Sequence, residues 1–114
     1  MVLLKRAYEP PSPEDGFRVL VERLWPRGLT KERAQVDLWL KEISPSPELR
    51  KWYSHDPAKW VEFQARYRAE LEQNSAVAQM QQVLRDHPIV TFVYAAHDEE
   101  RNSAVLLKEF LIGS

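Results

Sequence analysis

The chain has 114 residues, no cysteine, three glycines and a formal net charge of −1, and 44% of its residues are hydrophobic. This balance predicts one soluble α/β domain over residues 1–114, and it excludes a disordered chain, disulfide bonds, thiolate metal sites and glycine-rich phosphate loops. Because no apolar run is long enough to span a membrane and the N-terminus lacks the charge order of a secretory signal, we expect a cytoplasmic protein without membrane contact.

Two strands are predicted near the N-terminus. Residues 2–6 are apolar and short, and residues 17–24 alternate between large apolar and other side chains between two turn segments. The Trp-Pro-Arg-Gly stretch at residues 25–28 must end the second strand, because proline cannot continue a central ladder. Thr30 is placed to cap a short helical turn after it.

The middle of the chain begins with an ambiguous segment, residues 36–43, which we interpret as a short strand or an extended stretch. Ser46 and Pro47 then carry the preferences of a helix start, with serine as the N-cap and proline at the first helical position. This helix is predicted to run to about Tyr53.

Three further helices and one strand fill the rest of the chain. Asp56 and Pro57 predict the start of a helix whose apolar residues recur at spacings of three and four. The next helix must stop before Pro88. Residues 89–94 are almost continuously apolar, which predicts a strand buried on both faces. We expect Asp98 to cap the last helix.

These elements predict an α/β fold, with a small, mostly parallel or mixed sheet of three or four strands and helices packed on it. Sheets of this kind bind ligands in the crevice beyond the carboxyl ends of their strands. Two segments are expected there, residues 23–28 after one strand and residues 94–103 after another.

The first of these segments offers an anion-binding set. Arg23 and Arg27 stand four residues apart across a proline-stiffened turn, and paired guanidinium groups can clamp a phosphate or carboxylate. Trp25 could stack on a base or sugar. The alternative is structural: Arg23 would pair with a buried carboxylate such as Asp37, and Trp25 would close an edge of the core.

The second segment offers Tyr94, His97 and Asn102 where a strand leads into a helix whose free N–H groups attract anions. His97 could act as a catalytic acid or base. The alternative is that His97 is an exposed loop residue beside a helix cap. The histidines and acidic residues are not spaced as a metal-ligand set, so we expect no metal ion and no cofactor.

Residues 18–28, RVLVERLWPRG, closely resemble the signature of a small bacterial family, the YeaO-like branch of the domain of unknown function 488 (DUF488) family. The resemblance extends over most of the chain, including residues 45–51, 60–71, 94–96 and 104–107. It implies a compact α/β domain but no established activity, and therefore carries no catalytic role. His97 and Ser103 stand where this branch often has lysine and histidine, and the cysteines of the wider family are absent here.

Three functions follow as hypotheses. The leading one is a binder of a small anionic molecule, possessing a phosphate or carboxylate, with enzymatic activity left open and His97 as its proton carrier. Its cleft would be formed by Arg23, Trp25, Arg27, Tyr94, His97 and Asn102. The second is a nucleic-acid-binding or regulatory module that uses the basic stretch of residues 18–33, against which the overall charge counts. The third is a protein-interaction subunit with an exposed Trp25 or Trp52; the sequence does not determine the oligomeric state.

Overall fold

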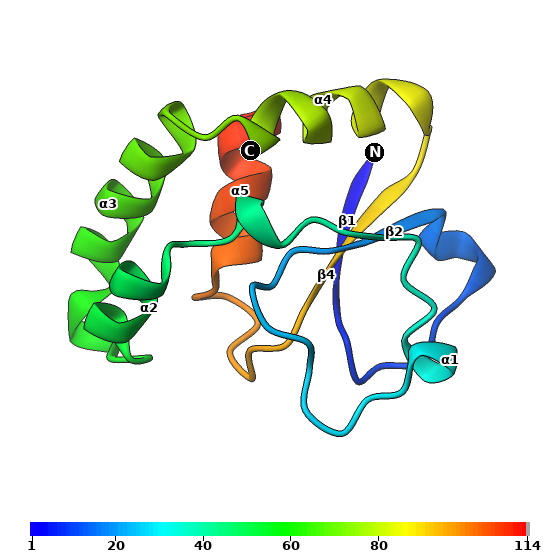
Figure 1. The fold of residues 1–114 in the computed structure, drawn as a ribbon, viewed down its shortest axis with the longest axis horizontal. Coiled ribbons are helices and arrows are strands. Elements are labelled where there is room, and N and C mark those ends of the chain that lie inside the picture. Colours follow the sequence, from blue (N-terminus) through cyan, green and yellow to red (C-terminus); the bar gives the residue numbers. More distant parts are fainter. Residues whose placement is uncertain (114) are drawn as a thin grey trace.

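A single parallel sheet organises the chain in the computed structural model, which describes residues 1–113 (Figure 1). The strands are β1 (Val2–Arg6), β2 (Phe17–Leu20), β3 (Leu38–Trp39) and β4 (Val90–Tyr94). Their order in the sheet is β1-β4-β2-β3, and every neighbouring pair is parallel. The predicted α/β fold is confirmed, with four strands in the sheet.

Helices lie in the connections from β2 to β3 and from β3 to β4, and one helix follows β4. They are α1 (Lys31–Ala34), α2 (Pro47–Tyr53), α3 (Trp60–Glu72), α4 (Ala76–Asp86) and α5 (Ser103–Ile112), with 3₁₀ turns at Pro13–Asp15, Lys41–Ile43 and Pro57–Lys59. None of the helices within residues 1–113 is both long and apolar enough to cross a membrane.

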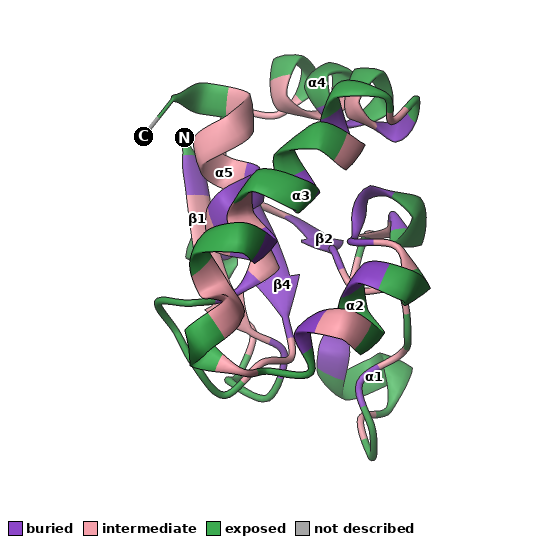
Figure 2. Cartoon of the chain, turned by 90° about the vertical axis from the view of Figure 1, so that its left-hand side faces the viewer, coloured by how far each residue is buried: buried purple, intermediate pink, exposed green. Residues whose placement is uncertain are grey.

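The core is divided between the two faces of the sheet, because successive side chains of a strand point in opposite directions. Val19 and Phe92 belong to the main core, which also contains the apolar residues of α2, α3, α4 and α5. Leu20 and Val93 belong to a second cluster, against which Trp25 and its neighbours pack. Strand β4 is buried along its whole length, as its continuous apolar sequence predicts (Figure 2).

Two predicted helix caps are present. The Thr30 side chain accepts a hydrogen bond from the Arg33 amide at 3.2 Å, and Ser46 Oγ accepts one from the Leu49 amide at 3.1 Å. A capping side chain satisfies an amide that has no partner within the first helical turn. The start of α2 is therefore stabilised by a local cap, and the Ser46 amide and hydroxyl also donate to the Glu70 carboxylate of α3 at 2.9 and 2.6 Å.

Strand β2 is shorter than predicted, since it ends at Leu20 rather than at residue 24. Beyond it, the Val21 amide still donates to the Val93 carbonyl at 3.1 Å, and the next bonds to the chain involve side chains. The Trp39 indole donates to the Glu22 carbonyl at 2.6 Å, and the Glu22 carboxylate accepts the Ala95 amide at 2.9 Å. These bonds turn the chain out of the sheet at its carboxyl end.

The prediction that Asp98 caps the last helix is wrong, because the N-cap of α5 is Asn102. Asn102 Oδ1 accepts the Val105 amide at 3.0 Å, while the Asp98 carboxylate accepts the amides of Glu100 and Arg101 at 2.9 Å each. Asp98 therefore organises a turn in the loop between β4 and α5, and the helix begins after that turn.

Candidate functional site

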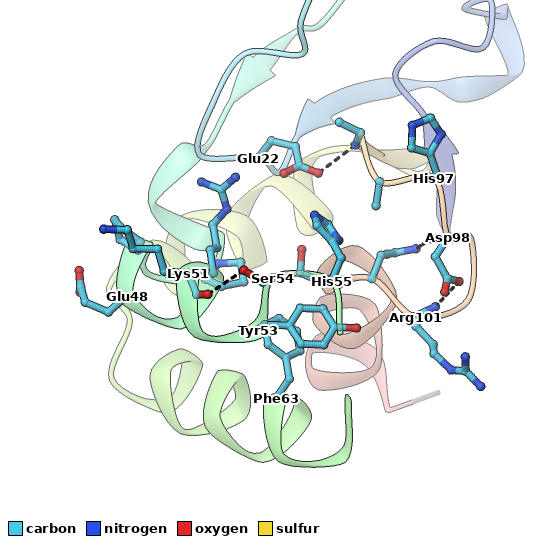
Figure 3. Close-up of a pocket in the computed structure, with 17 residues that line it drawn as sticks. Glu22, Glu48, Lys51, Tyr53, Ser54, His55, Phe63, His97, Asp98 and Arg101 are labelled. Carbon is cyan, nitrogen blue, oxygen red and sulfur yellow. Dashed lines mark hydrogen bonds between the residues drawn. The ribbon is translucent and has the colours of Figure 1, made fainter. Parts of the chain in front are cut away.

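A cleft of about 860 Å³ lies at the carboxyl ends of β2 and β4, between the loop that follows β4 and helix α2 (Figure 3). We call it the strand-end cleft. This is the place where a parallel sheet is expected to offer a binding crevice. The residues that line it are Glu22, Pro45, Pro47, Glu48, Arg50, Lys51, Tyr53, Ser54, His55, Phe63, Ala95, Ala96, His97, Asp98, Arg101, Asn102 and Ser103.

Glu22 is held rigidly at the sheet side of the cleft. The amide before it, that of Val21, donates to the Val93 carbonyl at 3.1 Å, and the Glu22 carbonyl accepts the Trp39 indole at 2.6 Å. Glu22 Oε2 accepts the Ala95 amide at 2.9 Å (Figure 3). Because backbone and carboxylate are both fixed, the carboxylate is presented to the cleft in one orientation.

Burial raises the pKa of the Glu22 carboxyl, and the Ala95 amide together with the charges of Arg50 and His55 opposes this shift only in part. None of the ion pairs within residues 1–113 includes Glu22. A half-buried carboxylate without a bonded cation is a group that attracts hydrogen-bond donors and positive charge.

The opposite side of the cleft is made by the end of α2. Ser54 and His55 both adopt left-handed backbone conformations, with φ values of 46° and 55°. The His55 ring points toward the side of the cleft that carries Glu22 (Figure 3). Two successive non-glycine residues in this region are uncommon, and such strain is concentrated at functional sites.

Tyr53, the last residue of α2, contributes an aromatic ring to this side of the cleft. Its ring stacks on Phe63 with centroids 4.3 Å apart, and Phe63 is anchored in the main core. Ala95 and Ala96 add small apolar groups from the loop after β4. The cleft therefore combines a flat apolar surface with charged groups at its edges, as small-molecule sites commonly do.

Three basic side chains line the cleft, those of Arg50, Lys51 and Arg101. None of the three side chains forms an ion pair with a carboxylate of residues 1–113. Three carboxylates balance them formally, from Glu22, Glu48 and Asp98. The lining of the cleft is thus mixed in charge rather than uniformly positive.

Of the residues expected from the sequence, His97 and Asn102 line the cleft. His97 is exposed, and its Nδ1 lies 3.4 Å from a guanidinium nitrogen of Arg6, at the long end of hydrogen-bonding distance. Arg6 also donates to the Ala96 carbonyl at 2.9 Å, which holds the loop in place. Both amide atoms of Asn102 are used locally, because Nδ2 donates to the Asp98 carbonyl at 2.8 Å.

Tyr94, Arg23, Trp25 and Arg27 do not line the cleft. Tyr94 is 3% exposed at the end of β4, and burial raises the pKa of its hydroxyl. Arg27 is exposed on the loop after β2. The structure therefore does not bring the two expected segments together around one cavity.

Arg23 is bonded within the fold, but its partner is not Asp37, the carboxylate named in the structural alternative drawn from the sequence. Its guanidinium donates to the carbonyls of Ser44 and Pro45 at 3.1 and 3.2 Å. Asp37 instead accepts the backbone amide of Arg18 at 2.8 Å. Because Pro45 lines the cleft, Arg23 stabilises the segment of the cleft lining that leads into α2.

Trp25 packs at the edge of the second core cluster. This role is the alternative to stacking on a ligand that the sequence left open. Its indole donates to the Leu29 carbonyl at 2.6 Å, and its ring meets Trp39 edge-on with centroids 5.5 Å apart. Trp25 and Trp52 are both half-buried. The large apolar residues that are exposed within residues 1–113 include no tryptophan; they are Met1, Tyr8, Leu24, Val61 and Ile112.

The sequence matches the family model described as "Inactive DUF488-N3 subclade" over residues 1–114. The chain belongs to the DUF488 family. It is 41% identical over 112 residues to the Mycobacterium tuberculosis protein Rv3073c, covering 98% of this chain and 94% of that protein. It is 38% identical over 108 residues to Escherichia coli YeaO, covering 94% and 93%. Both relatives are described as uncharacterized proteins. No solved structure gives a significant match.

The resemblance to the YeaO-like branch of the DUF488 family is therefore confirmed. The cleft residues that sequence reasoning missed in this family member are Glu22, Arg50, Tyr53 and His55. Glu22 carried one signal, a carboxylate near the end of a predicted strand of mainly apolar residues. The residues of α2 carried none, because only the fold brings that helix to the ends of β2 and β4.

Proposed function

We propose that the strand-end cleft binds a small ligand that carries a phosphate or carboxylate group. The observation that carries this proposal is that arginine side chains without an ion pair to any carboxylate of residues 1–113 line a cavity at the ends of parallel strands. Guanidinium groups form bidentate hydrogen bonds with both kinds of anion. Arg50 is the principal anion-binding residue, and Arg101 and His97 are further contacts at the rim.

We propose binding without turnover. The sequence-family model that matches this chain is described as an inactive subclade. This description supports a retained binding site rather than a catalytic one. Under this proposal His97, the proton carrier expected from the sequence, contacts the ligand without transferring a proton. A cytoplasmic location, where small phosphorylated and carboxylated molecules are abundant, is part of the same proposal.

A small ligand is preferred to nucleic acid because the basic stretch of residues 18–33 does not form a continuous charged surface. Arg18 is 3% exposed, and Arg23 is half-buried against backbone carbonyls. Only Arg27 and two neighbouring basic side chains of this stretch are exposed. Phosphate-backbone binding depends on several accessible cations in one row.

The proposal is tested by thermal unfolding in the presence of a panel of small phosphates and carboxylates. At a ligand concentration of about 100 times Kd, binding adds about 2.7 kcal/mol to the free energy of unfolding, which raises the melting temperature measurably. Arg50→Gln is expected to abolish the shift. Arg33→Gln, which removes the same charge from an exposed helical position outside the cleft, is expected to retain it.

Two results would contradict the proposal. One is a panel in which no compound raises the melting temperature of the wild-type protein. The other is a shift that survives in Arg50→Gln and disappears in Arg27→Gln, which would move the site to the loop after β2.

A further inference from the structure

We infer that the ligand of the strand-end cleft is a zwitterion: besides its anionic group it carries a cationic nitrogen, an amine or an amidinium, that is received by Glu22. This inference rests on the proposed function and adds the chemical class of the ligand. It follows from the contrast between two carboxylates of the same chain, from the free oxygen of Glu22, and from the arrangement of charge along the cleft.

Asp15 is a buried carboxylate with a structural role, and its hydrogen-bond partners provide the comparison for Glu22. It is 5% exposed, and it accepts hydrogen bonds from Lys5, from Arg18 and from the Ser12 amide. Burial acts to raise the pKa of the Asp15 carboxyl, but these partners outweigh it and hold the pKa below its ordinary value. A carboxylate removed from water is stabilised when cations and donors surround it.

The Glu22 carboxylate has fewer bonded partners than that of Asp15. It accepts one hydrogen bond through its carboxylate within residues 1–113, from the Ala95 amide to Oε2, and no cation is paired with it. Arg50 and His55 attract it electrostatically without bonding to it, and burial leaves the pKa of this carboxyl raised. Oε1 is therefore the acceptor that a donor entering the cleft would meet.

The position of Glu22 is fixed at its backbone and at one carboxylate oxygen. Its backbone is held by the Trp39 indole, and the preceding residue is still bonded to β4. A carboxylate that is rigid, half-buried and incompletely bonded is preorganised for a ligand, because binding a cation costs it little side-chain entropy. A primary amine or amidinium would supply the charge-assisted hydrogen bond that residues 1–113 do not supply.

The anionic end of the same ligand would meet Arg50, which belongs to the other side of the cleft. Tyr53 also lines the cleft, and its ring stacks on Phe63 with centroids 4.3 Å apart. A ligand that carries one group of each charge matches Glu22 and Arg50. A simple anion would leave Glu22 facing it, with like charges opposed.

The test compares matched compounds by titration calorimetry. One set is phenylalanine, 3-phenylpropionate, which lacks the amine, and phenethylamine, which lacks the carboxylate. The other set is phosphoethanolamine, ethyl phosphate and ethylamine. We expect at least one zwitterion to bind about tenfold or more tightly than both of its singly charged analogues, the gain typical of one charge-assisted hydrogen bond.

Glu22→Gln separates recognition of the cation from recognition of the anion. Glutamine keeps an acceptor for the Ala95 amide, so the variant is expected to fold, which its circular dichroism spectrum checks. It should lose about tenfold in affinity for the zwitterion while its affinity for the matched anion is unchanged or higher. Glu72→Gln, at the exposed end of α3, is the matched control and should change neither affinity.

The outcomes separate this inference from the proposed function. If the anions bind as tightly as the zwitterions, the inference is overturned and the proposed function stands. If the amines alone bind as tightly as the zwitterions, the requirement for an anionic group fails and both are overturned. If none of the six compounds binds, or if Glu22→Gln binds the zwitterion as wild type does, the zwitterion inference is overturned, while the wider phosphate and carboxylate panel still decides the proposed function.

Discussion

Replacing Asp15 with asparagine is expected to lower the free energy of unfolding by about 3–5 kcal/mol at neutral pH. Lys5 Nζ donates to the two oxygens of Asp15 at 3.1 and 3.2 Å, the Ser12 amide donates at 3.0 Å, and an Arg18 nitrogen donates at 2.6 Å. Arg18 is itself 3% exposed. The substitution would leave its guanidinium buried without a counter-ion, and that unpaired charge is the main cost.

The same substitution should change the pH dependence of stability. The pKa of Asp15 is lower in the folded state than its ordinary value, because the Ser12 amide, Lys5 and Arg18 outweigh the effect of burial. The contribution of Asp15 to the free energy of unfolding is therefore complete at pH values above its ordinary pKa. It is lost as the pH falls through the lower pKa of the folded state. Urea unfolding of wild type and Asp15→Asn should give curves of stability against pH that converge in acid.

The control is Glu62→Gln on α3. Glu62 pairs with Arg66, but the two side chains are 56% and 49% exposed, so the pair is open to solvent. Exposed pairs of this kind contribute about 0.5 kcal/mol or less. An effect of Asp15→Asn as small as that of Glu62→Gln would contradict the structural role assigned to the buried network.

Replacing Gly16 with alanine is expected to be the second strongly destabilising change. Gly16 has a φ of 63°, and a Cβ atom there would lie 2.3 Å from the Ile89 carbonyl oxygen and 2.8 Å from the Ile89 Cβ. That carbonyl also accepts the Phe17 amide at 2.9 Å, the first bond between β2 and the segment entering β4. The backbone strain costs about 1–3 kcal/mol. The forced displacement costs about 1–3 kcal/mol more.

Gly28 provides the matched comparison, since its φ is 76° and nothing lies within 4 Å of an added Cβ. Gly28→Ala should therefore cost only the conformational term, about 1–2 kcal/mol. Urea unfolding of both variants measures the difference. In Gly16→Ala the amide of Phe17 should also lose protection from hydrogen exchange. Equal losses in the two variants would show that the contact with Ile89 does not constrain the sheet.

The order of strands and helices could be predicted from sequence because it depends on local features, although β2 was predicted four residues too long. An almost continuous apolar run defines β4, and Ser46 with Pro47 defines the start of α2. The last helix shows the limit of such reasoning. Asp98 and Asn102 are both good capping residues, and the choice depends on a turn in which Asp98 already accepts two backbone amides.

The location of a cleft at the strand ends was predictable, since it follows from parallel topology, and His97 and Asn102 line that cleft. The rest of its composition was not. Arg23 bonds to carbonyl groups that precede α2, and no pattern in the sequence distinguishes such a partner from a ligand. Tyr53 and His55 lie across the cleft from Glu22 only because of tertiary packing (Figure 3).

The most direct test of the strand-end cleft is a nuclear magnetic resonance titration of the ¹⁵N-labelled protein with inorganic phosphate and with acetate. The proposed function predicts saturable shifts for the amides of Glu22, Ala95, Ala96 and residues 53–55, and none beyond those of a salt control for residues 26–33. Shifts that do not saturate, or that saturate only in residues 26–33, would contradict an anion site at the ends of β2 and β4.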